Sequence, residues 1–96
     1  MGRASIKKPA RLAEKLLAIR NSLNLSQNEL IRWLDLAEEL TQAEISAFER
    51  GVRVPPLLVL LRYARKFGVN VEILIDDELQ LNSKKKNQND KPNKIP

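Results

Sequence analysis

Residues 26–51 read SQNELIRWLDLAEELTQAEISAFERG and contain the starts of two helices. Each start has the pattern of a capping box, in which a Ser or Thr hydroxyl accepts a hydrogen bond from the amide three residues later while a Glu there reaches back. Ser26 and Glu29 supply the first box, and Thr41 and Glu44 supply the second. The segment therefore predicts two consecutive short helices joined by a turn.

Apolar residues within and before this segment follow a helical period. The second box leads into Ile45 and Phe48, and Gly51 is expected to end that helix because glycine adopts left-handed backbone without strain. Upstream, a helix is predicted over residues 9–23, and its apolar positions are Leu12, Leu16, Ile19 and Leu23. Asn24 then suits a left-handed stop.

The residues after Gly51 predict two more helices. Pro55-Pro56 suits a helix entry and Gly68 a helix exit. The inward stripe between them is predicted to be Leu57, Leu60, Leu61, Ala64 and Phe67. Residues 69–75 alternate like a strand, but a lone strand would have no partner, so a short helix is favoured. The sequence thus predicts an all-α fold of five helices.

The residue inventory argues against most catalytic and metal-site chemistry. The chain of 96 residues has no His and no Cys, so it lacks the usual general base, the commonest metal ligand and any thiolate nucleophile. We expect no enzyme activity, no metal and no cofactor. The longest apolar run, residues 55–61, is far shorter than the ~20 residues that span a bilayer. We expect a cytoplasmic protein without membrane contact.

The net charge of +5 is carried by the two ends of the chain. Residues 1–8 contribute +3 and are expected to form a flexible basic arm. Residues 82–96 contribute +4 and, being rich in Lys and Asn, are expected to form a disordered tail. Residues 9–81, the predicted folded domain, hold 9 basic and 11 acidic side chains. An anion-binding face on this domain must therefore come from a local arrangement of residues.

The order of these motifs resembles the Cro/Xre-like phage-repressor family of helix-turn-helix proteins. The resemblance covers roughly residues 10–79 and is carried by RNSLNLSQNEL at 20–30 and TQAEISAFERG at 41–51. It implies a compact five-helix, lambda-repressor-like domain in residues 9–81, whose third helix enters the DNA major groove while the second crosses the backbone. The implied function is sequence-specific regulation of transcription, as a repressor.

Three positions depart from the family pattern. Ile31 occupies a position that is usually small, and Asp35 stands where the turn glycine is expected. Thr41 arrives roughly one helical turn later than usual, after the added residues 36–40. An added turn of this length would widen the elbow around Ile31 and so compensate for its size.

The resemblance assigns roles to individual side chains. Gln42 opens the third helix, and its amide can donate to N7 and accept from N6 of adenine. The further candidates for base readout on the same face are Ala43, Ser46 and Ala47, of which the alanines suit thymine methyl groups. The candidate phosphate contacts are Gln27, Arg50 and Arg53. Arg20 and Glu49 are expected to form a structural ion pair between the first and third helices.

Two further features are assigned to packing and solvation. Trp33 is expected to be a half-buried packing residue and not a platform for base stacking. Asp76, Asp77 and Glu78 are adjacent on a short element, so their side chains diverge. They are expected to form a solvated acidic stretch rather than a metal site.

The expected partner is double-stranded DNA with a palindromic operator, bound by a homodimer, because one recognition helix covers only a few base pairs. The last helix is the predicted dimer interface, through Ile73, Ile75 and Leu79. The alternative is a protein-interaction module of the antitoxin type, for which operator binding is secondary. That alternative is favoured by the acidic group Asp35, Glu38 and Glu39.

Overall fold

The computed structural model describes residues 9–81, which form five α-helices and contain no strand. The helices are α1 (Leu12–Ser22), α2 (Gln27–Trp33), α3 (Gln42–Glu49), α4 (Leu57–Phe67) and α5 (Val71–Ile75). The predicted all-α fold is confirmed, including the short last helix. The predicted arm, residues 1–8, and tail, residues 82–96, lie outside the described residues. None of the five helices is long and apolar enough to cross a membrane.

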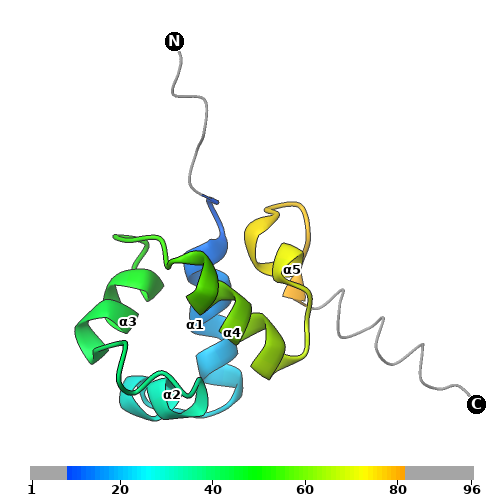
Figure 1. Cartoon of the computed structure of the whole chain (residues 1–96). Helices are drawn as coiled ribbons and strands as arrows, with labels where there is room; N and C mark the ends of the chain where they lie inside the picture. The colour runs from blue at the N-terminus through cyan, green and yellow to red at the C-terminus, as the bar shows by residue number, and fades with distance from the viewer. Residues whose placement is uncertain (1–8, 82–96) are drawn as a thin grey trace, which may run out of the picture.

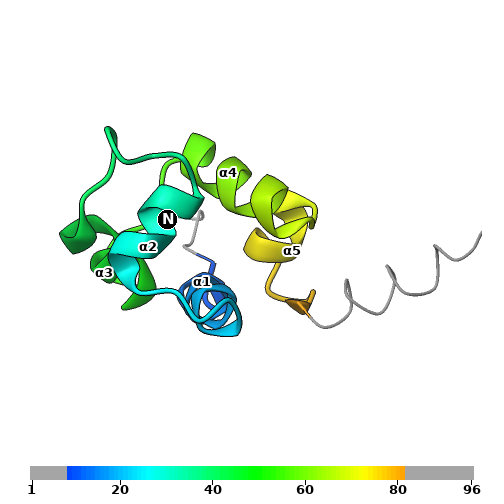
Figure 2. The same ribbon diagram turned by 90° about the horizontal axis from the view of Figure 1, so that it is seen from below.

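Helix α1 lies behind α4 at the centre of Figure 1, with α3 to one side and α5 to the other. It contacts α3 on one side and α5 on the other, while α2 packs against α3 and α4 packs against α5. In the view from below, α1 is seen almost end-on, with α2 and α3 to one side and α5 to the other (Figure 2). Helix α3 is therefore supported from within by α1 and α2.

The core is built mainly from aliphatic side chains, together with the aromatic rings of Phe48 and Tyr63. The fully buried large side chains come from all five helices and are Leu16, Ile19, Leu30, Leu34, Ile45, Phe48, Tyr63 and Leu74. Burying an aliphatic or Phe side chain contributes roughly 1.5–3 kcal/mol relative to exposure, so this cluster is the main source of stability. Trp33 packs half-buried against it, as expected.

The buried face of α4 differs from the predicted stripe. Leu57 is predicted to face inward but is 63% exposed, whereas Val59 and Tyr63 are buried. The buried stripe follows Leu60 and Tyr63 and extends toward Val59, which leaves Leu57 at the outer margin of the first turn. The prediction for Leu57 is therefore wrong. Apolar residues on α4 form two neighbouring stripes with the same helical spacing, and only the stripe that contains Val59, Leu60 and Tyr63 faces the core.

Both predicted capping boxes are present. The Ser26 hydroxyl accepts from the Glu29 amide at 3.0 Å, and the Glu29 carboxylate accepts from the Ser26 amide at 2.8 Å. This hydrogen bond from the Ser26 backbone lowers the pKa of Glu29. Thr41 and Glu44 form the same reciprocal pair at the start of α3. The two helix starts are thus fixed by residues three apart in the sequence.

The chain changes direction at four residues in left-handed backbone, which are Asn24 (φ 57°), Asp35 (φ 62°), Gly51 (φ 77°) and Gly68 (φ 82°). The predicted stops at Asn24, Gly51 and Gly68 are confirmed. Asp35 takes the conformation expected of the missing turn glycine, because a short polar side chain tolerates it better than most. Arg62 supports this turn by donating to the carbonyls of Leu34 and Asp35 at 2.6 and 3.3 Å.

Residues 36–40 form a separate hydrogen-bonded turn between α2 and α3. The Leu40 amide donates to the Leu36 carbonyl at 2.9 Å, and the Leu36 amide donates to the Ile31 carbonyl at 3.1 Å. Leu36 packs half-buried against the core, and Leu40 is buried. The inserted turn is therefore anchored to the core at its two ends, and it places Thr41 at the start of α3.

The acidic stretch after α5 is not wholly solvated. The Asp77 carboxylate accepts from the amides of Ala10 and Arg11 at 2.9 and 3.0 Å, which lowers the pKa of Asp77. It therefore supplies the start of α1 with acceptors from a distant part of the chain. The expectation of a solvated residue is wrong for Asp77, because its carboxylate meets free backbone donors. In the described range, no three potential metal ligands gather.

A buried lysine on α1 completes this link in the opposite direction. Lys15 is 3% exposed, and its Nζ donates to the carbonyls of Ile73 and Asp76 at 2.7 and 2.9 Å. Burial lowers the pKa of Lys15. These carbonyls belong to the end of α5, where a helix has acceptors without internal donors. Helices α1 and α5 thus satisfy each other's ends.

Candidate nucleic-acid interface

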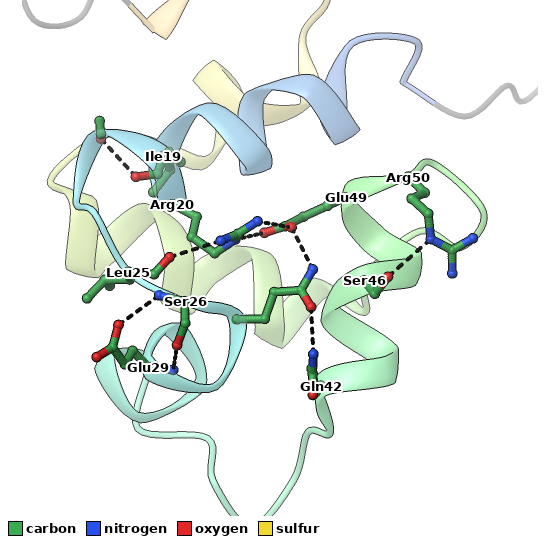
Figure 3. A network of polar contacts seen from close by, with 11 residues as sticks. Ile19, Arg20, Leu25, Ser26, Glu29, Gln42, Ser46, Glu49 and Arg50 are labelled. Atoms are coloured by element: carbon green, nitrogen blue, oxygen red, sulfur yellow. Dashed lines mark hydrogen bonds and ion pairs between the residues drawn. The ribbon is translucent and has the colours of Figure 1, made fainter.

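The outer face of α3 presents a short polar surface. Gln42 and Ala43 are exposed in its first turn, directly after the Thr41 cap. One turn later, the half-buried Ser46 hydroxyl accepts from Arg50 Nε at 3.1 Å (Figure 3). At about 100° per residue these side chains lie on one side of the helix. The face therefore combines an amide, a methyl group, a hydroxyl and a cation.

Ala47 does not belong to this face. It is predicted to share the outward surface with Gln42, but it is only 7% exposed. The helical step places Ala47 at the margin of the outward face, and the chain after Gly51 returns to this margin. There the amides of Val52 and Arg53 donate to the Ala47 carbonyl at 2.9 and 3.3 Å. The prediction of base readout by Ala47 is therefore wrong.

A chain of hydrogen bonds runs from α1 to the start of α3 (Figure 3). Arg20 donates through Nε and Nη2 to the two oxygens of Glu49, at 2.8 and 3.0 Å, and through Nη1 to the Leu25 carbonyl at 2.9 Å. Gln27 Nε2 donates to Glu49 Oε1 at 3.1 Å. Gln42 Nε2 in turn donates to Gln27 Oε1 at 3.1 Å. The expected pairing of Arg20 with Glu49 is thus the inner end of a longer network.

The inner end of the network is shielded from water. The Glu49 side chain is 4% exposed and the Arg20 side chain 18% exposed. The hydrogen bond to Glu49 raises the pKa of Arg20. Buried ion pairs of this kind depend on complete hydrogen bonding, and here Leu25 and Gln27 add to the direct contacts. The pair therefore fixes the distance between α1 and α3.

The charge of Glu49 sets the direction of the whole chain of hydrogen bonds. A carboxylate only accepts, so Gln27 must turn its NH2 group toward Glu49 and its oxygen toward Gln42. Gln42 must then turn its own NH2 group toward Gln27. The second N–H and the oxygen of Gln42 are left for a contact outside the described residues. The network thus orients an exposed amide from a buried charge.

The three candidate phosphate contacts lie in different settings. Arg50 is exposed at the end of α3. The Arg53 side chain is 53% exposed, with its guanidinium 5.8 Å from the Phe48 ring centroid and 3.6 Å from the Glu44 carboxylate. Gln27 is half-buried, and both of its polar atoms bond within the network. Arg50 and Arg53 thus remain open to an anion, whereas Gln27 is placed to hold Gln42.

The family model that matches this chain is that of helix-turn-helix proteins, over residues 16–74. The chain belongs to the helix-turn-helix family, of the Cro/C1 type. The match includes α2, the turn and α3, and it extends into α5. The protein is accordingly a DNA-binding regulator of transcription.

A solved structure with the same helix-turn-helix architecture is the crystal structure of a hypothetical transcription factor, NHTF, from Neisseria. It is 26% identical, has a TM-score of 0.60, and aligns over 83% of this chain and 84% of that chain. Among curated protein sequences, none matches significantly. The structural match covers the larger part of both chains, so they share the arrangement of the helix-turn-helix within its supporting helices.

The structure buries one of the three residues of the predicted dimer surface. Ile73 is 8% exposed, so its expected contact with a second copy is wrong. The reason is that α5 must cover the core of its own domain, and Ile73 and Leu74 both serve that purpose. Ile75 remains 40% exposed and Leu79 is half-buried.

Two polar features of the helix-turn-helix site have no signal in the sequence. The contact of Gln27 with Glu49 spans 22 residues and depends on how α2 and α3 are placed. Tyr63 has a buried hydroxyl without a hydrogen-bond partner in residues 9–81. Burial, together with the charge of Glu49, raises the pKa of Tyr63. The predicted stripe of α4 does not include Tyr63, so neither the burial of its hydroxyl nor the influence of the Glu49 charge on it was predicted.

Proposed function

We propose that this protein is a sequence-specific repressor that reads the DNA major groove with α3. The observation that carries the proposal is the Gln42 amide, which Gln27 orients through a hydrogen bond of 3.1 Å. Its second N–H and its oxygen match N7 and the N6 amino group of adenine. An amide that is oriented before binding loses less freedom on binding. Gln42 is therefore the principal candidate for base readout.

The residues near Gln42 suit contacts with a base pair and with the DNA phosphate backbone. Ala43 is exposed beside it, and its methyl group fits the methyl group of thymine. Ser46 lies one turn further along, where its hydroxyl can donate or accept. Arg50 and Arg53 follow at the end of α3 and supply phosphate contacts. In this assignment Gln27 positions Gln42, with one N–H left for a phosphate oxygen.

Repression requires less of the molecule than activation does. Occupying a promoter is enough to block transcription, whereas activation needs an additional contact with the transcription machinery. A helix-turn-helix domain covers a few base pairs with one recognition helix, so a useful operator needs two half-sites. The proposed partners are a palindromic double-stranded operator and a second copy of the chain. No cofactor is required for this chemistry.

The proposal is tested by selecting bound sequences from random duplex DNA with the full chain and with single variants. Gln42→Ala should lose the preference at one base pair, by about 1–3 kcal/mol. Arg50→Ala should weaken binding to all sequences by similar factors. Gln80→Ala, an exposed Gln-to-Ala change outside α3, is the matched control and should leave binding unchanged. Circular dichroism establishes that each variant is folded.

The same selection experiment can refute the proposal. Folded variants at Gln42, Ala43 and Ser46 that all kept the parent's preference would mean that α3 does not read bases. The protein-interaction module of the antitoxin type would then be favoured. Its supporting observation is the exposed acidic pair Glu38 and Glu39 on the turn before α3, which would repel a phosphate backbone and attract a basic protein surface.

A further inference from the structure

Glu49 is an acidic residue on the helix that is proposed to read DNA, yet its carboxylate does not lie on the reading face. The side chain is 4% exposed, so its negative charge is held away from solvent one residue before the exposed Arg50. Arg20 donates to both carboxylate oxygens, at 2.8 and 3.0 Å. Oxygen Oε1 also accepts from Gln27 at 3.1 Å. That additional contact is more than an ion pair between α1 and α3 requires.

The contact with Gln27 connects the buried charge to the exposed start of α3 (Figure 3). We call the series Glu49, Gln27 and Gln42 the relay. Turning over the Gln27 amide would place its oxygen against the Glu49 carboxylate, and two acceptors without a proton between them repel. A hydrogen bond to a charged group is about twice as strong as one between neutral groups, and burial strengthens it further. The relay therefore has one direction, which is set at its buried end.

The direction of the relay decides which side of the Gln42 amide donates and which side accepts. Across the major groove, an A·T pair presents the adenine N7 acceptor before the N6 amino donor, and a T·A pair presents them in the opposite order. An amide held in one orientation matches one of these pairs, and an amide turned over matches the other. A fixed orientation of Gln42 therefore discriminates between two base pairs that offer the same chemical groups.

We propose that Glu49 is a positioning residue that selects between A·T and T·A at the base pair read by Gln42, because it fixes the direction of the relay. The proposal rests on the proposed function and adds a specificity determinant that lies away from the DNA. Without the charge, the relay can run in either direction. Affinity for the preferred pair should then fall only about twofold, since about half of the molecules hold the competent orientation. Affinity for the exchanged pair should rise.

The first experiment measures the affinity of the full chain for two duplexes. They differ only by exchanging A·T for T·A at the base pair whose preference Gln42→Ala removes. The parent should distinguish them by at least about fivefold, the lower limit for a bidentate contact. Glu49→Gln keeps the side-chain size and an acceptor for Arg20, and it should bring the two affinities together through a gain on the disfavoured duplex. Combined with Gln42→Ala, it should leave their ratio unchanged. Glu38→Gln, at an exposed acid before α3, is the matched control and should keep the parent's ratio.

A second variant and a second measurement separate the relay from the ion pair. Gln27→Met breaks the relay but does not alter the groups that join Arg20 to Glu49, so the domain should melt close to the parent. It should bring the two affinities together as Glu49→Gln does. In nuclear magnetic resonance spectra of the free protein, the side-chain NH2 signals of Gln42 should move toward those of the exposed Gln80 in both variants.

Three outcomes decide against the proposal or locate the failure. An equal loss of affinity for both duplexes in Glu49→Gln overturns it, because Glu49 then only holds α3 in place. An unchanged ratio in Glu49→Gln and Gln27→Met, while Gln42→Ala abolishes the preference, also overturns it and leaves the proposed function standing. If the parent prefers no base pair, the proposed function fails, and the NH2 signals then decide whether Glu49 orients Gln42.

Discussion

Replacing Arg20 with Ala should be strongly destabilising, because it isolates a buried carboxylate. The change removes both hydrogen bonds from Arg20 to Glu49 and the one to the Leu25 carbonyl. The Glu49 side chain, which is 4% exposed in the native structure, then keeps Gln27 as its remaining side-chain donor. Removing one partner of a buried pair costs ~3–5 kcal/mol. The 18% exposure of Arg20 lets water reach the vacated space, so the expected loss is about 3 kcal/mol.

Urea unfolding followed by circular dichroism measures this loss, and a melting temperature about 12–24 °C lower should accompany it for a domain of this size. Arg65→Ala is the control, because Arg65 is exposed on α4, and it should change stability by less than ~0.5 kcal/mol. Arg20→Met/Glu49→Leu should be less destabilising than Arg20→Ala, since no charge is left buried. A loss below ~1 kcal/mol for Arg20→Ala, or a double variant less stable than the single one, would refute the argument.

Three further changes test other features of the molecule. Backbone amides hold the pKa of Asp77 below its usual 3.8, so its contribution is present above that pH and is lost as the pH falls through the folded pKa. Asp77→Asn should therefore flatten the acid side of the stability curve in urea titrations at pH 2–7, and an unchanged curve would contradict the cap. Tyr63→Phe should stabilise the domain by about 1 kcal/mol in the same assay, because it removes a buried hydroxyl without a partner; a loss would indicate a hydrogen bond to that group. Changing Lys84, Lys85 and Lys86 to Gln should weaken binding to all duplexes alike, and the slope of log K against log salt should become shallower by about 0.9 for each phosphate that the variant no longer neutralises. An altered base preference would instead make this segment a reader.

The features that were predictable from the sequence are those determined by residues close together in the chain. The box of Ser26 with Glu29 spans three residues, and so does that of Thr41 with Glu44. Neither depends on how the helices are arranged in space. The stop at Gly51 is equally local, because it reflects the backbone preference of a single residue. The all-α fold followed from these local signals and the apolar period.

The wrong predictions concern the margins of helical faces. Ala47, Leu57 and Ile73 each lie at the edge of an apolar stripe, where a rotation of less than one residue decides between burial and exposure. That rotation is set by packing between helices, which the period of one helix does not encode. The contacts of Asp77 and Lys15 with distant backbone groups could not be predicted from the sequence for a related reason. They form only because the ends of α1 and α5 lie next to each other in the fold. The base contacts of Gln42, Ala43 and Ser46 and the phosphate contacts of Gln27, Arg50 and Arg53 stay predictions.

The reciprocal ties between α1 and α5 make the two ends of the domain a single cooperative unit. Helix α5 has only five residues, and a helix of that length is not stable alone. Lys15 donates to carbonyls at the end of α5, and Asp77 accepts from the amides of Ala10 and Arg11, directly before α1. Neither end can fray without releasing the other, so hydrogen exchange at both should proceed through the same opening event. Loss of residues 76–81 would thus loosen the beginning of the domain together with its end.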